Sequence, residues 1–328
     1  MFVSLEHDNT ESPSTYKDAA YKAWRTIRNR QRAHSSYGAR ALEAFVAPSQ
    51  VTRIEHPEAT STPDTEPTLS FGKGIISQFH KTPADIACGK FWELRWAYGC
   101  PLDCNYCYLR GTMRGNMKPR IIKTEYVMSA LDQAFSSIKT PSIFNSGELS
   151  DSLMNPAVMA QVADKFETQS KHKLSTLSKF GPKNVEPFVS KPRKQTICAW
   201  SVNAIEVTRR WERAAAPPDK RIEAAKLVSE AGYDTRIRLD PIFPIEDWKT
   251  HYEDVVYRIF EALVPRRIIM GTPRGLWKTL EYAQKAGLKM DWADYFKEDS
   301  SWGKKLEFTR RQEIYEYFYD KLQSIGYD

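Results

Sequence analysis

The sequence predicts an α/β fold built around a parallel β-sheet. From about residue 91, short apolar segments typical of strands alternate with segments of helical periodicity. Six β-then-α units in a row imply right-handed crossovers, and an open or partial (β/α)6 barrel fits best because closure needs about eight units. The expected strands span residues 92–98, 142–147, 173–178, 195–202, 234–242 and 266–271. The expected helices span residues 124–135, 156–167, 219–232 and 251–264.

The N-terminal part of the chain has a different character. Residues 1–16 are polar and are expected to lack regular structure. Residues 16–45 form a strongly basic segment of helical character, which is either a solvated helix face or a nucleic-acid-binding arm. Residues 47–70 are rich in Pro, Ser and Thr and are typical of a linker. The expected units are residues 1–70 (extension and linker), 71–290 (the α/β unit) and 291–328 (a C-terminal unit).

The composition limits the possible functions. The chain has 328 residues, 41% of them hydrophobic, which is enough for a full-size α/β core. The N-terminus has no apolar region typical of a secretion signal, and no segment approaches the roughly 18 apolar residues that span a bilayer. Five cysteines, three of them close together, do not suit a disulfide framework, so we expect a reducing, cytoplasmic compartment. The net charge of +7 favours a polyanionic partner such as nucleic acid, although many basic proteins bind none.

Three cysteines follow the first expected strand directly. Cys100, Cys104 and Cys107 have the spacing C-x3-C-x2-C, which lets one loop wrap three thiolates around one face of a metal cluster. A closed structural zinc site needs four ligands, and neither Cys88 nor Cys198 lies in a second C-x2-C pair. An iron–sulfur cubane held by three thiolates keeps one iron open for a substrate or cosubstrate. A Cys3His zinc site and a fortuitous cluster of cysteines are the alternatives.

This motif resembles the signature of the radical S-adenosylmethionine (SAM) enzymes. Their C-x3-C-x2-C loop has an aromatic residue before the last cysteine, here Tyr106, and follows the first strand of a partial (β/α)6 barrel. The resemblance implies a 4Fe-4S cluster whose open iron binds the amino and carboxylate groups of SAM. Electron transfer from the reduced cluster then cleaves SAM to methionine and a 5′-deoxyadenosyl radical. The protein holds the cofactor, directs the radical and excludes water.

A narrower resemblance, over roughly residues 90–320, is to the spore photoproduct lyase family, which repairs a thymine dimer in DNA. The segment "CNYCYL" is followed by "KPRIIKTEYVMSA", as in that family. Further similar segments are "NSGELSD" (145–151), "TLSKF" (176–180), "WSVNAIEV" (200–207), "RIEAAKLVSEAGY" (221–233), "DPIF" (240–243) and "WGKKLEF" (302–308).

The resemblance implies which residues hold the cofactor. The carbonyl and ring of Tyr108 would lie beside SAM, and Ser150 would hydrogen-bond its methionine portion. Lys179 would pair with the SAM carboxylate, for which a compact point charge is suitable. Ser201 and Asn203 would contact the methionyl or ribose groups. Ordinary helix capping or loop solvation is the alternative for each of these polar residues at the ends of strands.

One departure from the family pattern concerns hydrogen return. The lyase has a cysteine after its second strand that returns a hydrogen atom to the product radical, and Glu148 takes the matching position here. A carboxyl O–H bond is too strong for this role, so the repair reaction is in doubt. Glu148 would instead bind the SAM amino group, act as an acid or base, or form a structural salt bridge. Cys198 is either a substitute donor or a buried small residue. The candidate catalytic residues are therefore Glu148, Tyr108 and Cys198.

Basic residues beside aromatic ones favour nucleic acid as the partner. The expected contacts are Trp302, Lys304, Lys305, Arg310 and Arg311, in a region that forms a duplex-opening hairpin in the lyase. Ordinary solvated charges are the alternative. We therefore expect a radical SAM enzyme that abstracts hydrogen from a thymine-like base in DNA, with a flavodoxin or ferredoxin as electron donor. A free nucleoside, small molecule or peptide substrate, and a non-catalytic nucleic-acid-binding iron–sulfur protein, are the alternative functions.

Overall fold

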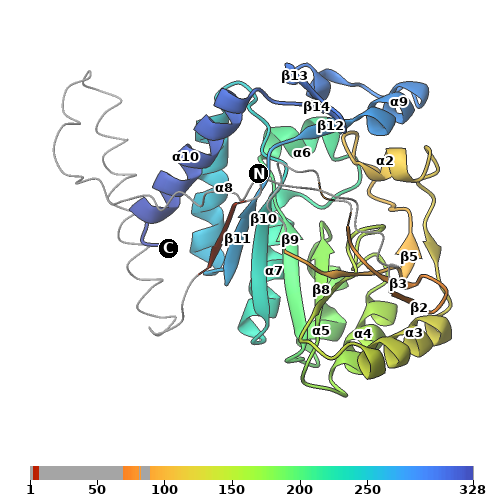
Figure 1. Ribbon diagram of the computed structural model, residues 1–328. Coiled ribbons are helices and arrows are strands. Elements are labelled where there is room, and N and C mark those ends of the chain that lie inside the picture. Colours follow the sequence, from red (N-terminus) through yellow and green to blue (C-terminus); the bar gives the residue numbers. More distant parts are fainter. Residues whose placement is uncertain (1–2, 7–68, 81, 83–88, 328) are drawn as a thin grey trace.

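A computed structural model describes residues 3–6, 69–80, 82 and 89–327 (Figure 1). The basic segment 16–45, most of the linker 47–70, and Cys88 lie outside the described residues. Within the described part of the chain, no helix is long and apolar enough to cross a membrane.

Six parallel strands form the centre of a nine-stranded sheet, in the order β1-β11-β10-β9-β8-β7-β4-β3-β2. All six predicted strands are confirmed, and each parallel pairing follows their order along the chain. The first predicted strand divides into β4, which joins this sheet, and β5 (Ala97–Tyr98), which pairs with β6 (Arg120–Ile121). The parallel strands are β4 (Trp92–Leu94), β7 (Ile143–Asn145), β8 (Lys173–Ser178), β9 (Thr196–Ser201), β10 (Asp234–Leu239) and β11 (Arg267–Met270).

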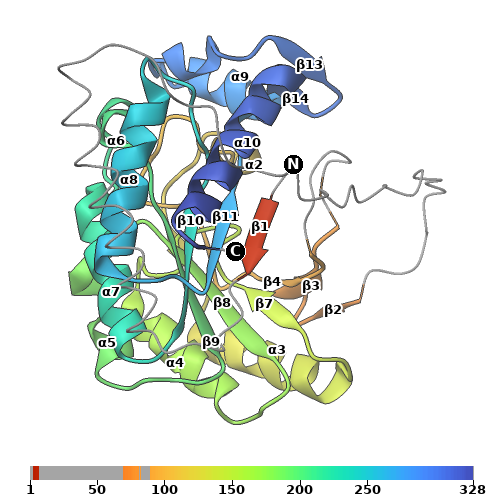
Figure 2. The same cartoon turned by 90° about the vertical axis from the view of Figure 1, so that its left-hand side faces the viewer.

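Antiparallel strands extend the sheet at both edges. β1 (Val3–Glu6) pairs with β11, as Figure 2 shows, so the prediction that residues 1–16 lack regular structure was wrong for this segment. At the other edge, β2 (Ser70–Phe71) and β3 (Ile76–Gln78) form a hairpin beside β4. These short strands gain their main-chain hydrogen bonds from a neighbouring edge, and so local periodicity does not reveal them.

The four predicted helices are confirmed and pack on the sheet (Figures 1 and 2). α4 shows how the sequence sets a boundary: the Asn155 side chain accepts a hydrogen bond from the Val158 amide (3.2 Å), and Pro156 occupies the first turn. The predicted four are α3 (Thr124–Ser137), α4 (Pro156–Phe166), α7 (Pro218–Glu230) and α8 (Trp248–Ala262). The others are α2 (Leu109–Thr112), α5 (Glu186–Val189), α6 (Ile205–Trp211), α9 (Trp277–Lys285) and α10 (Phe308–Ser324), with 3-10 turns η1 (Pro182–Asn184) and η2 (Asp291–Ala293).

The core lies between the sheet and these helices. Every residue of β9 is buried, as expected for a central parallel strand covered on both faces. Trp200 on β9 and Phe144 on β7 are fully buried. Aromatic contacts also join α8 to α10, where the rings of Tyr252 and Phe318 meet edge to face at 5.8 Å.

A second, three-stranded sheet follows β11 in the chain and lies above the carboxyl ends of the parallel strands in Figure 1. It consists of β12 (Arg274–Leu276), β14 (Gly303–Lys305) and β13 (Glu298–Ser300), in that order. β13 and β14 form a hairpin, α9 connects β12 to this hairpin, and α10 follows β14. The fold therefore places the small sheet over the end of the parallel sheet where functional groups gather.

Acid destabilisation through His172 is the prediction that follows from the core. The His172 ring is 1% exposed and stacks on Phe135 at 5.5 Å. Burial and the nearby Lys171 ammonium lower the His172 pKa below its ordinary value, so the unfolded chain binds the proton more readily. As pH falls below the ordinary histidine pKa, the free energy of unfolding should decrease by up to about 1.4 kcal/mol per pH unit. Chemical denaturation from pH 7 to pH 5 should show this loss in the wild type and a smaller loss in His172→Phe.

Candidate active site

The three cysteines lie in the loop between β5 and α2, as free thiols. Cys100 and Cys104 are buried and Cys107 is half-buried. Gly99 precedes them with φ +78°, and a Cβ there would lie 2.6 Å from the carbonyl oxygen of Lys118. A side chain at Gly99 would therefore both strain the backbone and collide with the neighbouring chain.

The segment at the end of α6 anchors this loop. The Asn105 amide donates to the Trp211 carbonyl at 2.8 Å, and the Ala214 amide donates to the Leu102 carbonyl at 3.1 Å. These two main-chain bonds join segments about a hundred residues apart in sequence. They hold the cysteine loop against the segment at the end of α6.

A buried arginine, Arg110, forms hydrogen bonds within the cysteine loop. The Arg110 side chain is only 4% exposed and donates from Nε to the Cys104 carbonyl (3.3 Å) and from its guanidinium to Asp103 (2.7 Å). Arg213 binds the other carboxylate oxygen of Asp103 at 3.0 Å. The loop thus keeps its shape through main-chain and ionic contacts that leave the three thiols free.

The three thiols fit a metal cluster that supplies positive charge. Burial raises the pKa of Cys100 to about 12 and also raises the pKa values of Cys104 and Cys107. Such thiols stay protonated until a metal compensates the thiolate charge. Among the described residues, no three His, Cys, Asp or Glu side chains are placed to hold a single metal ion. A cluster in which each thiolate binds a different iron does not require the three thiols to meet at one ion.

A network of buried charges lies beside the loop. The Lys179 ammonium, just beyond β8, donates to Ser201 Oγ (2.8 Å), Glu212 Oε1 (3.0 Å) and the Tyr106 hydroxyl (3.2 Å). Glu212 also accepts hydrogen bonds from the Tyr106 hydroxyl and from Arg221. The structure therefore brings together three residues predicted as cofactor contacts, Tyr106, Lys179 and Ser201, and adds two charged residues that were not predicted.

The Glu212 carboxylate stays ionised although its side chain is fully buried. Burial alone would raise its pKa, but Arg221 and Lys179 outweigh this effect and hold the pKa well below its usual range. The Arg221 side chain, also fully buried, donates in addition to the carbonyls of Ala216 (2.6 Å) and Ser201 (3.0 Å). This ion pair is therefore a fixed part of the site.

Ser150 offers an unpartnered polar atom next to the cysteine loop. It is 2% exposed, and its hydroxyl has no hydrogen-bond partner among the described residues. The neighbouring Asp151 accepts the main-chain amides of Lys179 (2.7 Å) and Leu153 (2.9 Å), which joins the end of β7 to the end of β8. A buried hydroxyl without a partner is costly, and a bound ligand would supply one.

Glu148 faces Tyr108 across the site. Its carboxylate accepts hydrogen bonds from Asn145 Nδ2 (2.7 Å) and the Tyr108 hydroxyl (3.3 Å), and its main-chain carbonyl also accepts from that hydroxyl. Burial raises the pKa of Glu148, and the Arg238 guanidinium opposes this rise. Tyr108 remains 40% exposed. Hydrogen bonds therefore hold the Glu148 side chain in place close to the cysteine loop. Burial makes its carboxyl group a weaker acid.

Two predicted site residues lie in structural positions. Asn203 is fully buried, and its side chain binds the Pro241 carbonyl (2.9 Å), the Ala204 amide (3.0 Å) and the Tyr252 hydroxyl (2.5 Å), so contacts within the protein account for its polar atoms. Cys198 is 2% exposed and belongs to the hydrophobic core. Because side chains alternate along a strand, Cys198 and Ser201 on β9 point to opposite faces of the sheet. Cys198 is thus directed away from the site.

The predicted nucleic-acid contacts, on the small sheet and the start of α10, fall into an exposed group and a buried group. Trp302 is 43% exposed, and the side chains of Lys304 and Arg310 are 43% and 46% exposed. Lys305 and Arg311 are instead buried and both bind Glu298. Trp277, at the start of α9, is 45% exposed and accompanies Trp302, to whose carbonyl its amide donates (3.2 Å). Trp277 was not predicted, because the rest of α9 and β13 separate it in sequence from Trp302 and the basic residues that follow.

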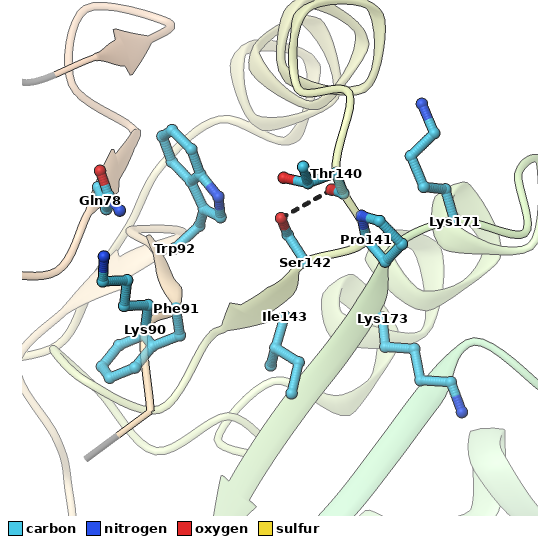
Figure 3. A pocket seen from close by; sticks show the side chains of 10 residues that line it. All are labelled: Gln78, Lys90, Phe91, Trp92, Thr140, Pro141, Ser142, Ile143, Lys171 and Lys173. Carbon is cyan, nitrogen blue, oxygen red and sulfur yellow. Dashed lines mark hydrogen bonds between the residues drawn. The ribbon is translucent and has the colours of Figure 1, made fainter. Parts of the chain in front are cut away.

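A cavity of about 520 Å³ lies at the opposite, amino end of the parallel sheet (Figure 3). Lys90, Lys171 and Lys173 line it, together with Trp92 and Ser142. In Figure 3 the lysine side chains extend in different directions and do not converge on a common point. The cavity therefore lacks the convergent polar groups of a ligand site and does not belong to the candidate active site.

A parallel α/β sheet with a C-x3-C-x2-C loop after its first parallel strand defines the radical SAM class of proteins. The family model described as spore photoproduct lyase matches residues 89–269, which is more than half of the chain. The chain belongs to the spore photoproduct lyase family. Its cofactors, a 4Fe-4S cluster and SAM, fit the three thiols and the polar side chains around them.

Curated relatives agree with this membership. Spore photoproduct lyase of Bacillus subtilis is 30% identical over 219 residues, which cover 58% of this chain and 61% of the relative. Spore photoproduct lyase of Clostridium acetobutylicum is 23% identical over 179 residues, covering 52% of each chain. The matched region thus spans between half and two thirds of each relative's length.

Solved structures show the same fold. A spore photoproduct lyase variant with bound AdoMet and a dinucleoside spore photoproduct superposes with a TM-score of 0.61 at 16% identity. The match covers 72% of this chain and 74% of that one. A spore photoproduct lyase complexed with the dinucleoside photoproduct gives the same TM-score at 17% identity.

Replacing single cysteines tests the proposed cluster ligands. After anaerobic reconstitution with iron and sulfide, we expect Cys104→Ala to lower the affinity for iron by more than about tenfold, since one of three thiolates is lost. Cys198→Ala is the matched control, because it removes an equally buried thiol on the other face of β9. Iron and sulfide content with visible absorption would measure both. Equal iron content in the two variants would refute the assignment.

Proposed function

We propose that this protein is a radical SAM enzyme that abstracts a hydrogen atom from a thymine-like base in DNA. The observation that carries the proposal is the loop of three free thiols, two of them buried, beside Lys179, Ser201 and Ser150 at the carboxyl ends of the parallel strands. Family membership supports the cofactor chemistry. The relatives are spore photoproduct lyases, and a solved relative holds a dinucleoside spore photoproduct, which supports a nucleic-acid base as the substrate class.

The roles of the side chains follow from their contacts. The bound cluster and SAM would supply the reductive C–S cleavage that yields a 5′-deoxyadenosyl radical. Lys179 would hold the SAM carboxylate, and the free Ser150 hydroxyl would donate to its methionine portion. Tyr108 would cover one side of SAM, and its hydroxyl is kept in place by Glu148. The low exposure of Lys179 and Ser150 strengthens their electrostatic interactions and limits access of water.

The environment of Glu148 favours base modification or rearrangement over repair. Glu148 occupies the position that the resemblance gives to the hydrogen-donating cysteine, and its carboxylate is fixed by Asn145 and Tyr108. Cys198, the remaining thiol among the described residues outside the loop, points to the opposite face of the sheet. A held carboxyl group with a raised pKa is suited to proton transfer with the substrate.

DNA is the partner that the small sheet fits. Trp302 and Trp277 are exposed aromatic residues suited to stacking, and the Lys304 ammonium lies 6.0 Å from the centre of the Trp277 ring. A base must leave the duplex stack for hydrogen abstraction, at a cost of a few kcal/mol, and aromatic side chains can offset this cost. In this proposal residues 291–328 contact DNA together with β12 and Trp277, which belong to the catalytic unit of residues 71–290, and residues 1–70 are an extension. The reductant would be a cytoplasmic flavodoxin or ferredoxin.

Isotope transfer tests the reaction. Reduced, reconstituted protein is incubated anaerobically with 5′-deuterated SAM and either DNA or free thymidine, followed by mass spectrometry of nucleosides and of 5′-deoxyadenosine. We expect 5′-deoxyadenosine whenever a substrate is present. We expect altered or deuterated thymidine only in the incubation with DNA. Absence of 5′-deoxyadenosine would exclude the enzymatic proposal. An altered free thymidine would favour a nucleoside substrate, and full repair of a thymine dimer would refute base modification.

The exposure of the basic residues predicts which of them contact phosphate. We expect Lys304→Ala/Arg310→Ala to reduce the slope of log affinity against log salt by about 1.8, since two phosphate contacts are lost. Their present partners, Asp299 and Glu313, form exposed ion pairs that contribute little to stability. Binding to a fluorescent duplex at several salt concentrations would measure this slope.

The matched control replaces the two buried cations. Lys305→Ala/Arg311→Ala should lower the melting temperature, because Glu298 loses both cationic partners, with little change in the salt slope of the folded protein. If the two double variants change the slope equally, exposure does not determine DNA contact and the assignment is wrong.

A further inference from the structure

The charges of Lys179, Glu212 and Arg221 do not cancel one another. Glu212 is the carboxylate that binds the Lys179 ammonium (3.0 Å), but the same carboxylate is also bound by Arg221. Two cations therefore share one anion, and Glu212 and Arg221 are both fully buried. Within this group of three side chains one positive charge is in excess, and it lies on the more exposed cation, since the Lys179 side chain is 17% exposed.

Neighbouring carboxylates do not pair with the Lys179 ammonium. Asp240 lies 3.6 Å from the Arg238 guanidinium, and Asp151 accepts two main-chain amides at the end of β8, which hold its carboxylate in place without adding a charge. Their contacts do not replace the pairing of Glu212 with Arg221. The charge of Lys179 that faces the cysteine loop therefore depends on whether Arg221 neutralises Glu212.

The same contacts fix the position of the ammonium group. Glu212, Ser201 and the Tyr106 hydroxyl surround Lys179 Nζ at 2.8–3.2 Å. Arg221 adds a second link, because it donates to the main-chain carbonyl of Ser201 at 3.0 Å. A lysine with four rotatable bonds would otherwise lose considerable side-chain entropy when it binds an anion.

We propose that Glu212 and Arg221 are positioning residues for the SAM carboxylate. Glu212 holds the Lys179 ammonium in place, and Arg221 neutralises Glu212 so that the Lys179 charge remains available to the ligand. This inference rests on the proposed function, since it concerns the same cofactor site. It adds two residues without direct contact to the cofactor and assigns opposite electrostatic effects to them.

Charge variants test the inference by SAM binding without turnover. The reconstituted, unreduced protein is used in equilibrium dialysis with SAM, so no cleavage occurs. We expect Arg221→Met to bind SAM about tenfold more weakly, because Glu212 then neutralises Lys179. Arg221→Lys keeps the charge and should stay within about threefold of the wild type. Glu212→Gln/Arg221→Met removes one anion and one cation together, so it should recover most of the affinity lost in Arg221→Met.

Two controls separate the electrostatic role from a structural one. Decarboxylated SAM keeps the sulfonium but lacks the carboxylate, so Arg221→Met should change its affinity less than twofold, or roughly 0.4 kcal/mol. Arg193→Met removes another buried, ion-paired arginine, bound to Asp164 at the amino end of the sheet. It should lower the melting temperature and leave SAM affinity unchanged. If Arg221→Met does not fold, Arg221→Gln keeps a donor for the buried carbonyls and should give the same tenfold loss.

The outcomes distinguish this inference from the proposed function. A wild-type protein that binds no SAM would overturn both. Unchanged SAM affinity in Arg221→Met or Arg221→Gln, with normal binding by the wild type, would overturn the inference alone. An equal loss for SAM and decarboxylated SAM would do the same, because a general structural defect would then account for the effect.

Discussion

The buried carboxylate of Glu212 is the constraint on which the geometry of the site depends. It accepts hydrogen bonds from Tyr106 in the cysteine loop, Lys179 beyond β8 and Arg221 on α7. A fully buried charge is costly unless every partner is in place, so these elements can take only one arrangement around it. Trp211 directly precedes Glu212, and its carbonyl accepts a hydrogen bond from the Asn105 amide. This bond joins the cysteine loop to the same segment as Glu212.

Burial and pairing give the neighbouring side chains different chemical characters. The pKa of Glu212 is lowered by two cations, whereas burial raises the pKa values of Glu148 and Asp240. The site thus carries a fixed anion at the end of α6, and carboxyl groups that ionise less readily after β7 and β10. Carboxyl groups in separate environments are a common basis for dividing ion binding and proton transfer within one site.

The small sheet illustrates how position determines the role of a basic residue. Lys304 and Lys305 are neighbours on β14, and strand alternation directs one side chain outward and the other toward Glu298. Arg310 and Arg311 differ in the same way on the first turn of α10. Composition and motif spacing treat these pairs as equivalent, although only the outward members can reach a phosphate backbone.

The sequence alone determined the six parallel strands, the four main helices, and the cysteine loop with its class of cofactor. These features depend on local periodicity and on ligand spacing within eight residues, and both can be recognised in the sequence without knowing the fold. Tertiary structure alone decided that Glu212 and Arg221 join the site, that Cys198 turns away from it, and that β1 pairs with β11. Those outcomes depend on contacts between distant segments and on which face of a strand is buried. Their physical cause is the cost of burying unpaired charge and unpaired main chain, which only the folded arrangement can satisfy.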